Sequence, residues 1–206
     1  MEAPLKTRFR ICVVLSAALL GKSYAASPGD IVPASCTNEI SLSYNDRQLT
    51  NIDLSGNALL TALYCNDNQL AHLDVSRNTN LASLFCHRNE LKELNLSQNI
   101  NLTHLGCGHN QLTNLDVSRN LRLTHLDCFN NPLKRLDLFH NADLTVLDCD
   151  NDQLTELNIA SNKSLTYVDV RANPLARIVV WWNPPGRIPP SIQLIYDGSP
   201  TLFYSP

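Results

Sequence analysis

The sequence lacks the short motifs that mark common catalytic sites. It has no GxSxG, no HExxH, no phosphate-binding loop and no CxxC pair. Histidines do lie near cysteines, but His87 is one residue from Cys86 and His104 is three from Cys107. Odd separations on a strand place side chains on opposite faces, so no cysteine–histidine dyad is expected. The sequence therefore predicts a protein that is not an enzyme, with no catalytic residues and no cofactor.

Long apolar runs and long runs of one charge are also missing. The apolar run from Ile11 to Leu20 is half the roughly 20 residues that a membrane-spanning helix needs. The chain carries 16 Lys and Arg against 19 Asp and Glu, a formal charge of −3. Such a balance gives no general attraction for nucleic acid or for an anionic membrane. We therefore expect neither a nucleic-acid partner nor a membrane span.

Residues 1–25 have the pattern of a signal peptide. Lys6, Arg8 and Arg10 precede the short apolar run, and Ser23-Tyr24-Ala25 fits a small-x-small cleavage site. The pattern predicts cleavage near Ala25 and a secreted or periplasmic chain. Removal of the segment takes four cations and one Glu, which changes the formal charge from −3 to −6.

The dominant positive feature is a repeat with a fixed period. It is marked by cysteines at 21-residue intervals: Cys65, Cys86, Cys107, Cys128 and Cys149. The same column begins with Tyr44 and ends with Val170. A fixed period of this length is typical of a solenoid, in which each repeat is one coil stacked on the last. Solenoids present long surfaces, so binding is the function that this architecture favours.

Each coil contains two short strand-like segments, each followed by an asparagine. Leu63, Cys65 and Asn68 form one half of a coil, and Leu73, Val75 and Asn78 form the other. Apolar residues two apart on a strand point to one side, so these columns should build one continuous core. An inward asparagine amide can donate and accept hydrogen bonds where the coil turns, and we interpret both asparagine columns as structural.

The pattern LxxLxCxxNxLxxLDVSxN, over residues 60–78, resembles bacterial leucine-rich repeat proteins of the internalin type with 21-residue repeats and a cysteine ladder. The resemblance covers residues 39–183 and implies a right-handed leucine-rich repeat solenoid. Such an array has short parallel β-strands and little or no α-helix, and the repeats here number six to seven. The resemblance also implies a secreted or surface protein that binds a partner, often one from a host.

The segments outside the repeats are expected to be caps. Residues 26–38 would form an N-terminal cap and residues 184–206 a C-terminal cap, since the end of a solenoid core must be covered. Six prolines in 184–206 predict that regular coils do not continue there. A partner-binding tail is the alternative for that segment.

The ladder cysteines are expected to be free and buried. They occupy inward positions, and neighbours on parallel strands suit disulfide torsions poorly. A soft metal held between adjacent thiolates is the alternative, although no metal site is predicted. Cys36, in the N-terminal cap, has no obvious partner.

Two outward columns on the cysteine strand vary from coil to coil and carry aromatic residues, which are favoured at binding surfaces. The predicted partner-binding residues are Tyr64, Phe85, His87, His104, His125, Asp127, Phe129, Asp148, Tyr167 and Asp169. Gly106 and Gly108 are expected to leave a shallow dip in this face. Asp127, Asp148 and Asp169 should stack and repel. A basic patch on a partner or a calcium ion would relieve that repulsion, and simple repulsion between solvated carboxylates is the alternative. His104 and His125 should stack as well, as solvated residues or around a metal ion.

The sequence predicts a secreted, monomeric leucine-rich repeat protein that binds a protein or glycan partner, on a host surface, through this face. A periplasmic or extracellular structural scaffold with no host role is the alternative. The outward positions of the other strand carry short, uniform polar residues, which favours a scaffold role for that side.

Overall fold

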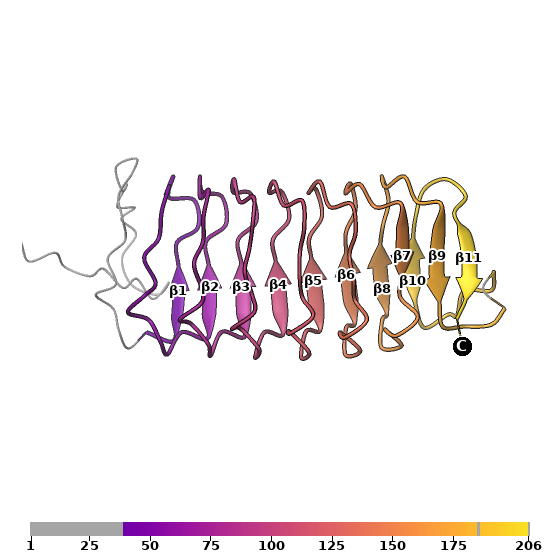
Figure 1. Cartoon of the computed structure of the whole chain (residues 1–206), viewed down its shortest axis with the longest axis horizontal. Helices are drawn as coiled ribbons and strands as arrows, with labels where there is room; N and C mark the ends of the chain where they lie inside the picture. The colour runs from indigo at the N-terminus through magenta and orange to yellow at the C-terminus, as the bar shows by residue number, and fades with distance from the viewer. Residues whose placement is uncertain (1–38, 185, 206) are drawn as a thin grey trace, which may run out of the picture.

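The computed structural model describes residues 39–184 and 186–205. The predicted signal peptide, its cleavage at Ala25, the cap at 26–38 and Cys36 lie outside these residues. Within them the chain forms a single row of stacked coils with strands and turns and no helix, as Figure 1 shows. No described helix is long and apolar enough to cross a membrane.

The cysteine strands form an eight-stranded parallel sheet in the order β1-β2-β3-β4-β5-β6-β8-β10. These strands are β1 (Ser41–Ser43), β2 (Ala62–Tyr64), β3 (Ser83–Phe85), β4 (His104–Gly106), β5 (His125–Asp127), β6 (Val146–Asp148), β8 (Tyr167–Asp169) and β10 (Gln193–Ile195). A second, three-stranded sheet has the order β11-β9-β7. Its strands are β7 (Glu156–Asn158), β9 (Arg177–Val180) and β11 (Thr201–Tyr204).

The register of the larger sheet confirms the predicted period. Leu63 pairs with Leu84, and Leu84 pairs with Leu105, so equivalent leucines stack directly. All three are at most 1% exposed. Each fully buried leucine stabilises the fold by roughly 1.5–3 kcal/mol, and the stacked columns form one core along the array.

The cysteine ladder is buried and reduced. All five ladder cysteines are free and 0% exposed. Burial raises the pKa of the Cys65 thiol to about 12. This confirms the interpretation of these residues as small core side chains.

The two asparagine columns are structural, as expected, but they differ in their bonding. In the first column, Asn110 Nδ2 donates to three carbonyls while its Oδ1 accepts from Leu91 N at 3.0 Å. In the second column, Asn99 Nδ2 donates to the Val75 and Asn78 carbonyls, but its buried Oδ1 accepts nothing. The turn N–H groups there already bond to turn carbonyls, as Leu102 N does to Asn99 O, so no donor is left for the amide oxygen.

The C-terminal segment adds an eighth, irregular coil to the six or seven that the repeats predict. Leu194 of β10 pairs with Val168, a longer step along the chain than the regular step from Leu147 to Val168. Leu202 of β11 pairs with Ile178, which is again a longer step than that from Leu157 to Ile178. The described prolines of this segment lie outside β10 and β11. They therefore remove no backbone hydrogen bond between paired strands. The prolines therefore end the regular period without ending the stack of strands.

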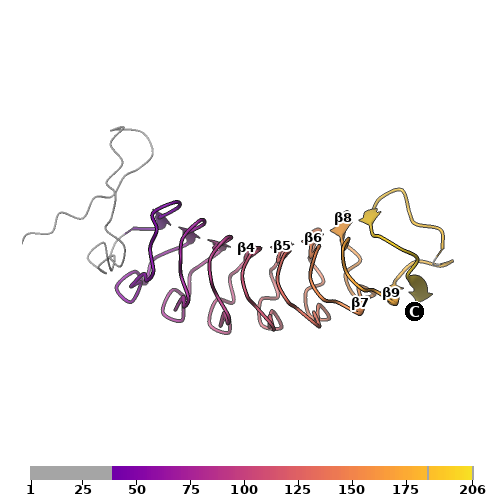
Figure 2. The same ribbon diagram turned by 90° about the horizontal axis from the view of Figure 1, so that it is seen from above.

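Figure 2 shows that the array is curved, with the larger sheet on its concave side and β7 and β9 on its convex side. The cysteine strand therefore faces the concave side, a point that the sequence left open. The outward side chains of the larger sheet line the inside of the curve.

Candidate partner-binding face

The predicted binding residues do point away from the core, on the concave side. On β3 and the two residues that follow it, the side chains of Leu84 and Cys86 point inward and are buried. Those of Phe85 and His87 are half-buried. The aromatic residues of this face are half-buried because they pack against one another rather than standing alone in solvent.

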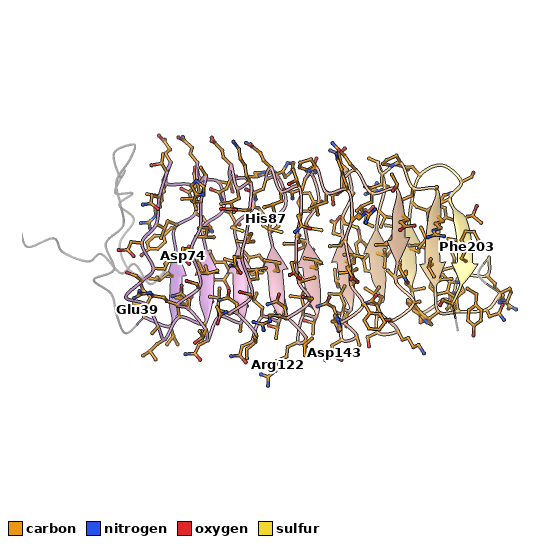
Figure 3. All side chains as sticks on the ribbon, viewed as in Figure 1. Glu39, Asp74, His87, Arg122, Asp143 and Phe203 are labelled. Carbon is orange, nitrogen blue, oxygen red and sulfur yellow. The ribbon has the colours of Figure 1, made fainter. Side chains whose placement is uncertain are left out.

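Four of these residues form a continuous aromatic stripe, defined here as Tyr64, Phe85, His87 and Phe129. The rings of Tyr64 and Phe85 are stacked, with centroids 5.4 Å apart and an interplanar angle of 4°. The Phe85 and His87 centroids are 6.2 Å apart, and those of His87 and Phe129 are 5.6 Å apart. The stripe thus crosses four neighbouring coils, and His87 lies beyond the end of β3 in Figure 3.

Gly106 and Gly108 lie under the stripe and do not form the expected open dip. A Cβ on Gly106 would collide with the His87 ring and would come within 2.7 Å of Phe85 Cδ1. A Cβ on Gly108 would come within 2.8 Å of the Phe129 ring. The expectation of a dip was wrong because neighbouring rings lean into the space that the missing side chains leave. The two glycines are what allow the rings to lie flat and connect.

His104 and His125 form a second aromatic pair beside the stripe. They are register partners, and their ring centroids are 4.5 Å apart. The hydroxyl of Thr103 lies 2.9 Å from His104 Nδ1, and that of Thr124 lies 2.9 Å from His125 Nδ1. Burial and the neighbouring His125 lower the pKa of His104, against the opposite effect of Asp127. The predicted stacking of the two histidines is confirmed.

The aspartate column is stacked as predicted, but its members are not equivalent. Asp127 pairs in register with Asp148, and Asp148 with Asp169. Burial raises the pKa of Asp127, partly offset by His125. Burial is also the largest cause that raises the pKa of Asp148, to about 6.

Asp169 forms an ion pair with Arg171 of the same coil. It is 2% exposed, and Arg171 Nη2 lies 2.6 Å from its Oδ2. Burial alone would raise the pKa of Asp169, but the hydrogen bonds and charge of Arg171 outweigh it and lower that pKa. The repulsion at this end of the column is thus relieved within the chain, by Arg171, rather than by a partner or a calcium ion.

Tyr167 lies apart from the aromatic stripe, on β8. Its hydroxyl is 3.4 Å from Asp169 Oδ2. The ten predicted residues therefore fall into two groups, an aromatic group over β2–β5 and an acidic group over β5–β8 that includes Tyr167.

Sequence reasoning missed His109 as a member of the aromatic group. Its ring meets the Phe129 ring edge-on, with centroids 5.1 Å apart. His109 has a φ of 53°, at the turn that follows the strand, where strand parity does not apply. His109 occupies the turn position directly before Asn110 of the first asparagine column. The recurrence of that position from coil to coil was the signal that could have placed it.

Polar side chains on the convex side form hydrogen bonds with the nearby backbone. Asp53, Asp74 and Asp116 each accept a hydrogen bond at Oδ1 from the backbone N–H of the serine two residues later, at 2.9 Å. This confirms that the short polar side chains there bond nearby backbone.

No group of three or more metal-ligating side chains occurs among residues 39–184 and 186–205. His104 and His125 thus lack a third ligand in the described part of the chain. The described concave face presents aromatic and acidic side chains.

No family model matches the chain, and no curated protein matches it. Solved structures do. The functional domain of InlJ from Listeria monocytogenes, which includes a cysteine ladder, is 34% identical with a TM-score of 0.67, and the match covers 79% of this chain and 34% of that one. An internalin from the same species, InlF, is 26% identical with a TM-score of 0.62, covering 69% of this chain and 44% of that one.

YopM, a leucine-rich effector protein from Yersinia pestis, shares the fold at 23% identity and a TM-score of 0.59 over 79% of this chain and 50% of that one. The chain spans half or less of the length of these three structures. The chain is a leucine-rich repeat protein whose 21-residue coils and cysteine ladder resemble those of the internalins.

Proposed function

We propose that this protein is a secreted, non-enzymatic binding protein that holds a partner protein on its concave face, through the aromatic stripe. The partner belongs to a host surface. A glycan on such a partner is the second ligand that an aromatic surface accommodates. Similarity to internalins supports a binding function.

The aromatic stripe over two glycines is the observation that carries the proposal. A solvated sheet has no need of a connected line of rings, and aromatic residues are enriched where proteins bind partners because they bury large areas with few rotors. The stripe lies on the concave side, whereas the convex polar residues are engaged in local bonds.

The area of the sheet limits how the partner binds. Eight strands about 4.8 Å apart span about 34 Å, and a strip about 12 Å wide offers about 400 Å². A standard interface buries about 800 Å² on each partner. A tightly bound partner must therefore also contact the turns beside the sheet, where His109 extends the stripe.

The test is capture by the immobilised chain from a host-cell surface extract and from a bacterial envelope extract, with a glycan array alongside. The site variant carries Tyr64→Ala, Phe85→Ala and Phe129→Ala. The matched control carries Ile100→Ala, Leu121→Ala and Phe139→Ala, which remove three exposed apolar side chains from other positions. Circular dichroism establishes that both variants are folded.

The proposal predicts a saturable host protein that the control retains and the site variant loses. A partner retained by both variants would place binding elsewhere on the array. Binding to the glycan array alone, lost in the site variant, would replace the protein partner by a glycan. No saturable ligand in any arm would favour the structural scaffold.

Secretion is tested separately. Fractionation of expressing cells and N-terminal sequencing of the exported chain should give a start at Ala26. A chain that stays in the cytoplasm with the segment 1–25 still attached would contradict this part of the proposal.

A further inference from the structure

The first asparagine column requires a side chain that donates hydrogen bonds. Asn110 Nδ2 lies 3.0 Å from the Cys86 carbonyl, 3.0 Å from the Cys107 carbonyl and 3.3 Å from the Gly108 carbonyl. Asn89, Asn131 and Asn173 repeat this pattern with the carbonyls 24, 3 and 2 residues before them. In these coils the position therefore presents three carbonyl acceptors to the asparagine side chain, and the equivalent carbonyls for residue 152 are those of Cys128, Cys149 and Asp150.

Asp152 fills the same position of the column between Asn131 and Asn173 and is 4% exposed. An ionised carboxylate only accepts hydrogen bonds, so it has nothing to give to the carbonyls of this turn. Its Oδ1 accepts from Asn131 N at 2.7 Å, and its Oδ2 lies 3.9 Å from Cys128 Sγ. Only a protonated Asp152 has a donor to offer there.

The charges around Asp152 act in the same direction. The pKa of Asp152 is raised to about 8, with burial as the largest cause and the charges of Asp150 and Asp148 on its own coil acting in the same direction. The hydrogen bond from the Asn131 N–H lowers the pKa of Asp152, but burial and the two carboxylates outweigh it.

Within residues 39–184 and 186–205, no cation is among the groups that shift the pKa of Asp152. The preceding coils contribute the buried Cys128 and Cys107, whose thiols are neutral because burial raises their pKa. The following coil has Val170 in the cysteine column, and its Arg171 is paired with Asp169.

We propose that Asp152 makes the stability of its turn depend on pH. The protonated side chain keeps the turn at residues 149–153 ordered, and loss of the proton destabilises that turn. The folded state binds this proton more tightly than the unfolded state. Stability contributed by the proton is therefore complete below the ordinary aspartate range, and is lost as pH rises through the higher folded-state value. The turn lies at the end of β6, so the acidic half of the concave face would move with it.

Hydrogen exchange of the purified full chain, read by mass spectrometry, tests this directly. Protection of peptides over residues 146–158 is compared between about pH 3.5, below the ordinary aspartate pKa, and about pH 9, each time against Asp152→Asn at the same pH, which cancels the intrinsic pH dependence of exchange. Asp152→Asn places in this coil the residue of the other coils, so it is expected to fold.

The proposal predicts equal protection of the two chains at the lower pH and more than about tenfold faster exchange of the wild-type turn at the higher pH. Asn110→Asp should create the same pH dependence at residues 107–111. Asp148→Asn, which removes the neighbouring titrating group, should leave the effect in place. Equal exchange of wild type and Asp152→Asn at both pH values would overturn the proposal, as would a change spread evenly over all coils.

Discussion

The ring of Phe129 covers Gly108 so closely that a Cβ on the glycine would come within 2.8 Å of it. The glycine itself is buried, although it lies on the outward side of the sheet. The same relationship holds between Gly106 and the rings of Phe85 and His87. The aromatic stripe is thus built from large residues in the coils of β2, β3 and β5 and from the absence of side chains at Gly106 and Gly108 in the coil of β4 between them.

Replacement of Gly108 by alanine should therefore displace Phe129 and weaken partner binding. We expect the free energy of unfolding to fall by about 1 kcal/mol, because the half-buried ring can move aside. Gly186→Ala is the matched control, since a Cβ there meets nothing within 4 Å. Urea denaturation gives the stability of each variant. An unchanged affinity with a displaced ring would remove Phe129 from the binding surface.

Phe85→Ala should leave the array folded. The ring is half-buried and stacks on Tyr64, so its loss removes about 0.5–1.5 kcal/mol of ring–ring interaction beyond the small area that it buries. Leu84→Ala, at the neighbouring position but with a fully buried side chain, should cost about 2–5 kcal/mol. Chemical denaturation of the two variants compares them. A Phe85→Ala chain that is less stable than Leu84→Ala would reverse our assignment of the two faces.

The ladder thiols should be unreactive in the folded protein. They are 0% exposed, and burial raises the pKa of Cys65 to about 12, so almost no reactive thiolate forms at neutral pH. Alkylation followed by peptide mass spectrometry should label Cys65, Cys86 and Cys107 only after denaturation. Cys107→Asp should abolish the folded circular dichroism spectrum, because it buries a charge in the core. Rapid labelling of the native ladder would contradict the packing described.

Arg171→Ala should destabilise the chain at neutral pH and do so less in acid. Burial acts to raise the pKa of Asp169, but Arg171 holds it below its ordinary value, so the substitution leaves a buried carboxylate without its cation. The stability from this pair is present above the unfolded pKa of about 4 and is lost as pH falls through the lower folded value. Thermal unfolding at several pH values measures this loss.

The control for this prediction is Arg177→Ala. Arg177 pairs with Glu156, but both side chains are about half exposed, so its removal should change stability little. Equal effects of the two substitutions at neutral pH would show that burial of Asp169 contributes nothing.

The regular coils could be predicted from the sequence because each column repeats one physical requirement. Leu63 and Leu84 must point inward to pack, and Asn110 must bond turn carbonyls, so period and parity alone place them. The eighth coil could not be predicted, because the steps from Val168 to Leu194 and from Ile178 to Leu202 are longer than the period.

The details of the concave face depended on side-chain packing that no period encodes. The sequence placed Phe85 and Phe129 on the correct side but could not show that they lean over Gly106 and Gly108. It also could not assign Arg171 to Asp169, since that pairing depends on rotamers at the end of a strand. The turn residue His109 was missed because alternation ends where the strand ends.

The central claim, that the aromatic stripe is the binding surface, is tested most directly by hydroxyl-radical footprinting of the chain with and without its captured partner. The extent to which each aromatic side chain is modified measures its exposure to solvent. Phe139 serves as an internal control, because it is 66% exposed and lies outside the stripe. The account predicts that the partner lowers modification of Tyr64, Phe85, His87 and Phe129 and leaves that of Phe139 unchanged. Protection confined to Phe139, or to Trp181 and Trp182 at the end of the array, would contradict it.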